Sequence, residues 1–252
     1  MTLPAAFLTT PFAHRGLHDR ALGRPENSRA AFAAAISAGY GIELDIQAAA
    51  DSTAMVFHDD DLDRLTAELG PVRARAADVL GAILLNGGDE GIPTLAEVCD
   101  LVAGRVPLLI EIKDQDGALG AHVGPLEQAV ADVLRGYAGP FAVMSFNPHS
   151  MVAMARLLPG APRGLTTCVF DPAESGAAPE TCARLSTIAD YSTVGACFLS
   201  HDHHDLANPR VAQLKAEGAA ILCWTIRTPA QEAAARRIAH TITFEGYAPP
   251  LA

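Results

Sequence analysis

The chain has 252 residues, half of them hydrophobic, so it can form the core of one large domain. Its net charge of −11, with no basic run of five or more residues, argues against a nucleic-acid groove or a basic membrane patch. No apolar stretch reaches the roughly 18 residues of a membrane span, and residues 1–10 lack the positive charge and apolar core of a secretory signal.

Apolar runs and turn residues along the chain predict alternating strands and helices. Strands are expected at 12–14, 41–47, 54–58, 106–113, 140–145, 164–169, 194–199, 220–225 and 240–244. Helices are expected at 28–38, 94–103, 121–135, 149–157, 179–189, 208–216 and 229–238. This βαβα order predicts an α/β fold, a TIM-type (β/α)8 barrel, in a single domain over residues 1–252.

One predicted strand is surplus to the eight of a closed barrel. Only about six residues separate strands 41–47 and 54–58, whereas a parallel crossover needs about a dozen. One of the two is therefore expected to be a hairpin return near the barrel mouth, which would bring His58 toward Glu43 and Asp45. Residues 59–92 show little strand pattern, so we expect them to form a small insertion over the barrel mouth.

Charged side chains occur in two predicted strands that are otherwise apolar. Glu43 and Asp45 lie in strand 41–47, and Glu111 and Lys113 follow an aliphatic run. Alternate residues of a strand face the same way, so the members of each pair share a face. Buried carboxylates are costly to ionise alone, and one divalent cation, Mg²⁺ or Ca²⁺, would remove that cost. The alternatives are a solvated edge strand and a simple Glu111–Lys113 ion pair, which the aliphatic neighbours disfavour.

Two histidines and two basic residues complete a set that suits phosphodiester chemistry. His14 and His58 each stand at the end of a predicted strand, and barrel enzymes keep their chemistry at strand carboxyl ends. A pair of histidines suits general acid and base catalysis near neutral pH. Arg15, Lys113 and the cation would stabilise negative charge on phosphoryl oxygens. These residues indicate cleavage of an anionic phosphodiester, without showing which histidine is the acid and which is the base.

Eight short motifs also stand in the order of a known enzyme family. They are His14-Arg15-Gly16, Pro25-Glu26-Asn27-Ser28, Glu43-Leu44-Asp45-Ile46, Val56-Phe57-His58-Asp59, Leu62-Asp63-Arg64-Leu65-Thr66, Ile92-Pro93-Thr94-Leu95, Glu111-Ile112-Lys113 and Trp224-Thr225. Through them the chain resembles the glycerophosphodiester phosphodiesterase family from about residue 12 to about residue 245.

The resemblance implies hydrolysis of glycerophosphodiesters to an alcohol and sn-glycerol 3-phosphate, with the glycerol 2-hydroxyl as internal nucleophile. It implies metal binding by Glu43, Asp45 and Glu111, and acid–base catalysis by His14 and His58. It also implies that the insertion at about 59–92 is the small extra subdomain that the family carries.

Four further residues are weaker site candidates. Glu26 and Asn27 could contact the substrate or other site residues, or could cap the following helix. Trp224 could line the alcohol pocket or belong to the core. Arg227 stands where the family commonly has Asn or Asp, and we hypothesise that it recognises an extra anionic group or a rim carboxylate. Residues 201–205, His-Asp-His-His-Asp, have the composition of a transition-metal site, but a solvated loop is the preferred interpretation.

The end of the chain also departs from the family pattern. Where Thr-Asp-x-Pro is common, this chain has Thr243-Phe244-Glu245-Gly246, which puts the substrate in question more than the reaction. A related phosphodiesterase acting on lysophospholipids or sugar-phosphate diesters is one alternative, with the apolar run 79–85 as a hint. A metal-dependent aldolase or lyase and a non-catalytic phosphate-ligand binding protein are more remote, since neither needs both histidines.

The five cysteines are odd in number and scattered, with no C-x-x-C pair. They are expected to be reduced, mostly buried thiols of a cytoplasmic protein. The expected partner is a small-molecule phosphodiester, with no nucleic acid and no integral membrane association. The sequence leaves the oligomeric state open, a homo-oligomer included.

Overall fold

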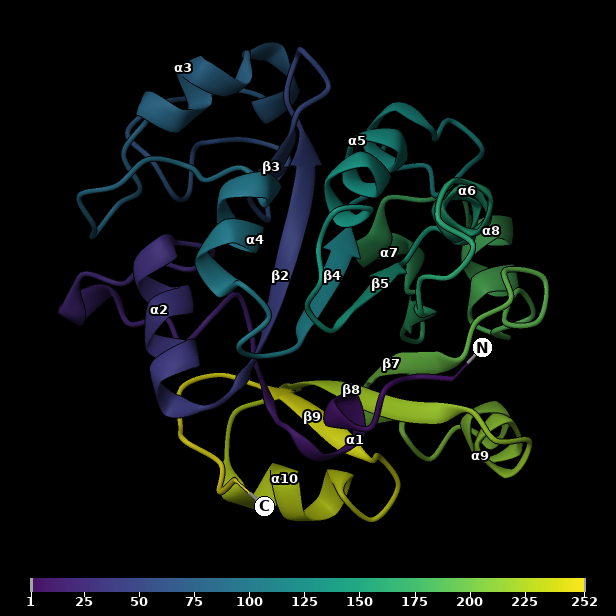
Figure 1. The fold of residues 1–252 in the computed structure, drawn as a ribbon. Coiled ribbons are helices and arrows are strands. Elements are labelled where there is room, and N and C mark those ends of the chain that lie inside the picture. The colour runs from purple at the N-terminus through teal and green to yellow at the C-terminus, as the bar shows by residue number, and fades with distance from the viewer. Residues whose placement is uncertain (1, 252) are drawn as a thin grey trace.

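The computed structural model describes residues 2–251, without the side chain of Glu174. Eight parallel strands form the wall of a barrel: β1 (Phe12–Ala13), β2 (Gly41–Ala48), β4 (Leu108–Ile112), β5 (Phe141–Ser145), β6 (Arg163–Thr167), β7 (Phe198–Asp202), β8 (Ala220–Ile226) and β9 (Thr241–Phe244). β1 pairs with β2 on one side and with β9 on the other, so the sheet is closed. The predicted TIM-type barrel is therefore confirmed (Figure 1).

The chain also forms helices, most of which connect successive strands and cover the outside of the barrel (Figure 1). They are α1 (Ala6–Thr9), α2 (Arg29–Ala38), α3 (Ala77–Ala82), α4 (Leu95–Val102), α5 (Pro125–Leu134), α6 (Pro148–Leu157), α7 (Pro172–Ser175), α8 (Pro179–Leu185), α9 (Pro209–Ala216) and α10 (Pro229–Ala235), with 3-10 turns at Arg20–Leu22, Val72–Ala74 and His203–Asp205. In α4, a Thr94–Glu97 capping box fixes the start, and the apolar residues recur at helical spacing on its buried face.

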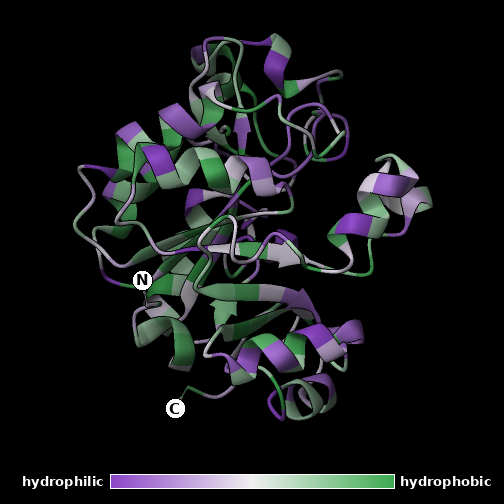
Figure 2. Cartoon of the chain, turned by 90° about the vertical axis from the view of Figure 1, so that its right-hand side faces the viewer, coloured by the Kyte–Doolittle hydropathy of each residue, from purple (hydrophilic) through white to green (hydrophobic). Residues whose placement is uncertain are grey.

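Successive side chains of β2 and β4 point alternately to the outside and to the inside of the barrel. Ile42, Leu44 and Ile46 are fully buried in the core shared with the outer helices. Leu109 belongs instead to a second core inside the barrel, with Phe12 and its neighbour Phe7 of α1. Inward-facing side chains nearer the carboxyl ends of the strands are polar. This change from apolar to polar side chains along the strands gathers the polar ones at one end of the barrel. Figure 2 shows hydrophobic strands within and hydrophilic stretches on the surrounding helices.

β3 (Ala54–Val56) is the surplus strand, and it pairs antiparallel with the end of β2. The predicted hairpin return is therefore correct, with strand 54–58 as the returning member. Residues 59–92, here called the cap, follow it and lie beyond the carboxyl end of β2 (Figure 1). The cap forms a small apolar core with the residues just before it, made by Leu62, Leu65, Val72, Leu80, Leu85 and Ile92 of the cap with Ala49, Met55 and Phe57.

The largest difference between predicted and observed strand positions is at β7. Strand 194–199 was expected, whereas β7 spans Phe198–Asp202 and includes His201, whose side chain is fully buried. The imidazole of His201 pairs with the Thr167 hydroxyl at 2.7 Å, and its other nitrogen lies 3.2 Å from Asp205 Oδ2. Because these partners satisfy the ring, a polar residue can occupy the core of the wall. The interpretation of residues 201–205 as a solvated loop is therefore wrong for His201.

Candidate active site

Three carboxylates converge at the carboxyl ends of β2 and β4. Glu43, Asp45 and Glu111 are at most 5% exposed, and each offers a ligand oxygen within 4.8 Å of the others. Asp45 and Glu111 are direct partners in the parallel β2–β4 ladder. The shared face predicted for Glu43 and Asp45 is thus present, and the neighbouring strand adds the third carboxylate. Hard oxygen donors in this number suit a divalent cation such as Mg²⁺ or Ca²⁺.

The charge balance of this group is uneven. Burial raises the pKa of Glu43 well above its ordinary value of 4.5, and the adjacent carboxylates Asp45 and Glu111 raise it further. Burial also acts to raise the pKa of Asp45, but positive charge, above all that of Lys113, holds it well below 3.8. The three carboxylates would therefore need additional positive charge nearby to be ionised together. A bound cation would provide that charge, so these residues are suited to be its ligands.

Arg15 and Lys113 supply the basic side chains of the site. Lys113 Nζ lies 2.9 Å from Asp45 Oδ1 and 2.6 Å from Glu111 Oε1. The Arg15 backbone N–H donates to Glu43 at 3.1 Å, and its Nε lies 3.3 Å from Asp45 Oδ2. Both predicted basic residues thus lie against the carboxylates.

His14 stands directly after β1 and is held by a carboxylate from the other end of the sequence. Its Nδ1 lies 2.6 Å from Glu245 Oε2, and its backbone N–H donates to the Phe244 carbonyl at 2.9 Å. Burial lowers the pKa of His14 below 6.5, and the hydrogen bond to Glu245 partly opposes this. Hydrogen bonds from His14 and His18 hold the pKa of Glu245 well below 4.5, so Glu245 is ionised.

His58 is held in the same manner by its neighbour in the sequence. Its Nδ1 lies 2.6 Å from Asp59 Oδ1, and Arg64 of the cap donates to both oxygens of Asp59. Burial acts to raise the pKa of Asp59, but the bonds from His58 and Arg64 keep it well below 3.8. In both site histidines Nδ1 is therefore occupied by a carboxylate, which leaves Nε2 as the remaining ring nitrogen.

Glu26 and Asn27 do not cap the helix that follows them. Ser28 caps α2, accepting a hydrogen bond from the Ala31 N–H. Asn27 instead donates from Nδ2 to Asp45 Oδ2 at 2.9 Å, and so orients a candidate metal ligand. Glu26 accepts from Arg15 and from Arg64, linking the barrel loop to the cap.

Arg227 lies on the rim of the site and is 55% exposed. Its Nε donates to Glu245 Oε1 at 2.6 Å. The rim carboxylate in the hypothesis for Arg227 is therefore Glu245, the same residue that holds His14. Sequence reasoning noted the unusual residues at both positions but did not identify Glu245 as a site residue.

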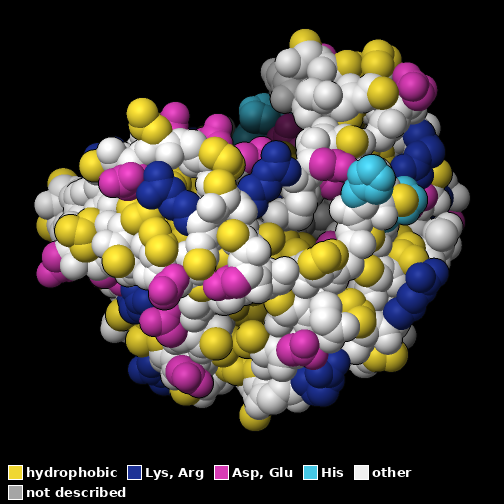
Figure 3. All heavy atoms as spheres, turned by 90° about the horizontal axis from the view of Figure 1, so that it is seen from above, with side chains coloured by type: hydrophobic (Ala, Val, Ile, Leu, Met, Phe, Trp, Pro, Cys, Tyr) yellow, Lys and Arg dark blue, Asp and Glu magenta, His cyan; other side chains and the backbone are white. Residues whose placement is uncertain are grey.

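All seven main candidates line one cavity of about 190 Å³: His14, Arg15, Glu43, Asp45, His58, Glu111 and Lys113. Trp224 and Arg227 also line it, and Trp224 donates from its indole N–H to the Ser200 carbonyl. Figure 3, seen from above Figure 1, shows a notch at the edge of the molecule with acidic, basic and histidine side chains near it. A second cavity of about 650 Å³ adjoins the first and opens outward.

Outside this site, Asp202, His203 and His204 also bring ligand atoms within 4.8 Å of one another. They follow the buried His201 at the end of β7, and His204 is exposed. They do not line the smaller cavity that holds the seven candidates.

The order and placement of these residues agree with the comparison of the sequence to known families. A sequence profile of the glycerophosphoryl diester phosphodiesterase family matches residues 14–242. The chain belongs to this family. Its members are phosphoric diester hydrolases, so this family member is an enzyme, and the carboxylates, histidines and basic residues described above form its candidate active site.

Curated relatives support the assignment to the glycerophosphoryl diester phosphodiesterase family. A glycerophosphodiester phosphodiesterase of Bacillus altitudinis is 30% identical over 161 residues, which cover 60% of this chain and 64% of the relative. One from Caldanaerobacter subterraneus is 32% identical over 168 residues, 62% of this chain and 66% of the relative. The alignments thus span somewhat less than two thirds of these two relatives.

Solved structures share the fold. A phosphodiesterase of Oleispira antarctica, in complex with the product sn-glycerol-3-phosphate, has a TM-score of 0.75 at 22% identity, covering 95% of this chain and 94% of that one. A glycerophosphodiester phosphodiesterase of Thermotoga maritima has a TM-score of 0.71 at 22% identity, with 94% of each chain covered. No helix among residues 2–251 has the length and hydropathy needed to cross a membrane.

Proposed function

We propose that this chain hydrolyses glycerophosphodiesters to an alcohol and sn-glycerol 3-phosphate. The observation that carries the proposal is the single cavity lined by three buried carboxylates, two carboxylate-bound histidines and two basic residues. Membership of the phosphodiesterase family supports it, as do the names of the relatives. In the net reaction water is consumed, the P–O bond to the alcohol breaks, and the alcohol leaves with a proton.

Glu43, Asp45 and Glu111 would hold one divalent cation, Mg²⁺ or Ca²⁺. When bound, the cation supplies Lewis-acid stabilisation of charge on the phosphoryl oxygens. Asn27 fixes the orientation of Asp45 through its amide. Lys113 and Arg15 line the same cavity and add positive charge for an anionic diester.

The two histidines would move the protons through Nε2, because Nδ1 of each faces a carboxylate. Burial lowers the pKa of His14, so its neutral form is favoured near pH 7. His14 therefore suits the base that takes the proton of the glycerol 2-hydroxyl as it attacks phosphorus, and His58 suits the acid that protonates the departing alkoxide. Water would then open the resulting cyclic phosphate to give sn-glycerol 3-phosphate, which balances the net reaction. Glu245 and Asp59 would keep each imidazole in the tautomer that these roles need.

The proposal is tested by measuring release of sn-glycerol 3-phosphate from glycerophosphocholine and glycerophosphoethanolamine, in EDTA and with added Mg²⁺ or Ca²⁺. The wild type should be active only with a cation, and Glu43→Gln, His14→Asn and His58→Asn should each lower kcat by at least about 100-fold. Glu180→Gln, a carboxylate exposed on α8, is the control. Undiminished release from the histidine variants would refute the acid–base assignment.

The alternatives make different predictions in the same assay. A phosphate-ligand binding protein would bind the diester with no release of product by the folded wild type. Within residues 79–85, which gave the hint of a lysophospholipid groove, Leu80 and Leu85 are buried in the apolar core of the cap, whereas Val79 and Leu84 are exposed. Release of product from lysophosphatidylcholine at a higher rate than from glycerophosphocholine would nevertheless favour that alternative.

A further inference from the structure

The larger cavity leads directly out of the catalytic one. It shares His58, Glu111, Lys113, Phe146 and Trp224 with the smaller cavity, so the two cavities meet beside these site residues. A phosphodiester carries two organic groups, one on each side of the phosphate. The protein must provide space for both of them. The cavity of about 650 Å³ is the more open of the two and can take the substituent that varies between substrates. We call this cavity the outer groove.

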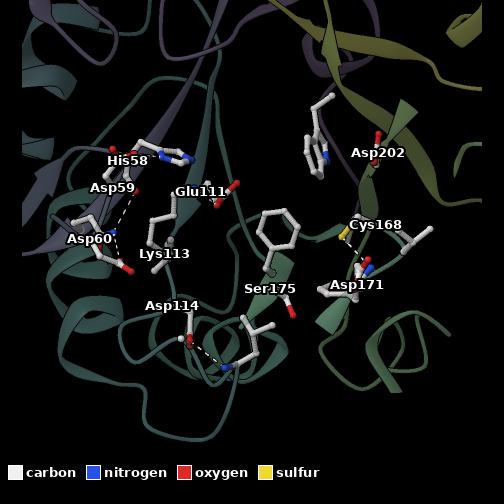
Figure 4. A pocket seen from close by; sticks show the side chains of 18 residues that line it. His58, Asp59, Asp60, Glu111, Lys113, Asp114, Cys168, Asp171, Ser175 and Asp202 are labelled. Atoms are coloured by element: carbon white, nitrogen blue, oxygen red, sulfur yellow. Dashed lines mark hydrogen bonds and ion pairs between the residues drawn. The ribbon is translucent and has the colours of Figure 1, made fainter. Parts of the chain in front are cut away.

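Carboxylates line the outer groove on both sides. Asp59 and Asp60 lie on one side with His58, Asp171 and Asp202 lie opposite, and Asp114 lies at the foot (Figure 4). Lys113 is the one basic residue among the described lining residues, and it already pairs with Asp45 and Glu111. The groove therefore presents a strongly negative field to whatever enters it.

Neutral groups, rather than cations, hold three of these carboxylates. Asp60 accepts from the Gln47 amide at 2.9 Å, and Asp171 accepts from the Ala173 N–H at 2.9 Å. Asp114 accepts from the Asn147 amide at 2.7 Å and from the Leu119 N–H at 3.0 Å. Among residues 2–251, none of the three forms an ion pair in the structure. Their charge thus remains available to a cationic ligand.

Aromatic rings line the outer groove together with the carboxylates. Phe146 lies edge-on to Trp224 at a centroid distance of 5.5 Å and to Phe170 at 6.0 Å. All three line the groove, together with the buried Leu119 and the exposed Val169. Ring faces beside carboxylates are the surroundings that favour ammonium groups, and above all quaternary ammonium groups.

We infer that the outer groove binds the alcohol half of the diester and selects alcohols that carry an ammonium group. This inference rests on the proposed function, because it assigns the leaving group of that reaction. An apolar alcohol of the same shape would gain the aromatic contacts but not the attraction to Asp60, Asp114 and Asp171. An alcohol with an added negative charge would be repelled by the same carboxylates.

The test compares two substrates of nearly equal shape that differ in charge. Glycerophosphocholine carries a trimethylammonium group, and its 3,3-dimethylbutyl analogue carries a neutral tert-butyl group in the same place. For the wild type with Mg²⁺ or Ca²⁺, kcat/KM should favour the choline ester by roughly 10-fold, the sum of a few modest charge and cation–π contributions. The 3,3-dimethylbutyl ester reports shape alone.

Variants then assign the preference to the groove. Asp60→Asn and Asp171→Asn keep a hydrogen-bond acceptor for Gln47 and for the start of α7, so the local structure has no reason to change. Each should lower the choline preference roughly 2- to 4-fold, and the double variant should nearly abolish it. Asp132→Asn, which removes an exposed carboxylate from α5 outside the groove, should leave the ratio unchanged.

The outcomes separate this inference from the proposed function. Hydrolysis of both esters at equal kcat/KM by the wild type would overturn the groove assignment while leaving the reaction intact. A choline preference that persists in the Asp60→Asn, Asp171→Asn double variant would also overturn it. If the folded wild type releases product from neither ester with any cation, the proposed function itself fails.

Discussion

Glu245 connects two site residues, His14 and Arg227, through the two oxygens of its carboxylate. It lies 231 positions after His14, in a segment that departs from the family pattern. A contact between sequence neighbours such as His58 and Asp59 can be predicted from the sequence, because adjacent residues are close in space. The contact between His14 and Glu245 cannot be predicted in this way, because the two residues meet only through the pairing of β1 with β9 in the closed barrel. The signal available was the coincidence of two unusual residues, Arg227 and Glu245.

Replacing Glu245 by Gln should impair catalysis more than binding. Without the carboxylate, the His14 ring loses its fixed orientation, so kcat should fall about 10- to 100-fold with little change in KM. The carboxylate also stabilises protonated His14, so its loss should move the acidic limb of the pH–kcat profile to lower pH. Glu245→Asp should restore part of the rate. An unchanged profile in Glu245→Gln would show that Glu245 has only a structural role.

Arg227 should act through Glu245. Because its Nε donates to the carboxylate that holds His14, Arg227→Ala should lower kcat/KM about 2- to 5-fold in the wild type. In the Glu245→Gln background the same change should have almost no further effect, which a double-mutant cycle measures. Additive losses, or a changed ranking of glycerophosphodiesters by Arg227→Ala alone, would point instead to direct recognition of substrate.

At the level of elements, the alternation of strands and helices was predictable because each type has its own apolar period. The four carboxyl-end charges of β2 and β4 were predictable for the same reason, since the alternation fixes which side they face. β7 was misplaced because its second half, Ser200-His201-Asp202, is polar. What makes that half a strand is pairing with β6 and β8 and the contact of His201 with Thr167, none of which is local in the sequence.

Arg64 links the cap to the barrel, and its loss should affect activity more than stability. It bridges Glu26 and Asp59, the carboxylate that holds His58. Since Arg64 is about half exposed, Arg64→Ala should change the free energy of unfolding by less than about 1 kcal/mol in urea denaturation. We expect kcat/KM to fall roughly 5-fold, because Asp59 is less constrained. Arg135→Ala, which removes an exposed ion pair with Asp132 outside the residues that line the two cavities, should change neither quantity.

For the whole molecule, the metal site should make stability depend on divalent cations. In EDTA, the raised pKa of Glu43 adds to the free energy of unfolding at pH values below 4.5, the ordinary pKa of the group. This contribution is lost as the pH rises through the raised pKa. Glu43→Gln should therefore lose less stability than the wild type between pH 4.5 and pH 8.

Added Mg²⁺ or Ca²⁺ should reverse this order. At roughly 100-fold excess over Kd, the cation should raise the Tm of the wild type by about 5 °C or more, and that of Glu43→Gln much less. Thermal unfolding in both buffers provides the measurement. Equal shifts in the two proteins would mean that the cation binds somewhere other than the carboxylates Glu43, Asp45 and Glu111.

The closure of the barrel by β1 has a consequence for biosynthesis. β1 has two residues, and it is inserted between the second strand and the last one, so His14 meets Glu245 only when the ring is complete. A growing chain on the ribosome can form α2, β2 and β4 long before residue 245 has emerged, but it cannot yet orient His14. Contacts of such long sequence separation form slowly. Enzymatic turnover would thus report completed ring closure during synthesis, which helical content cannot do.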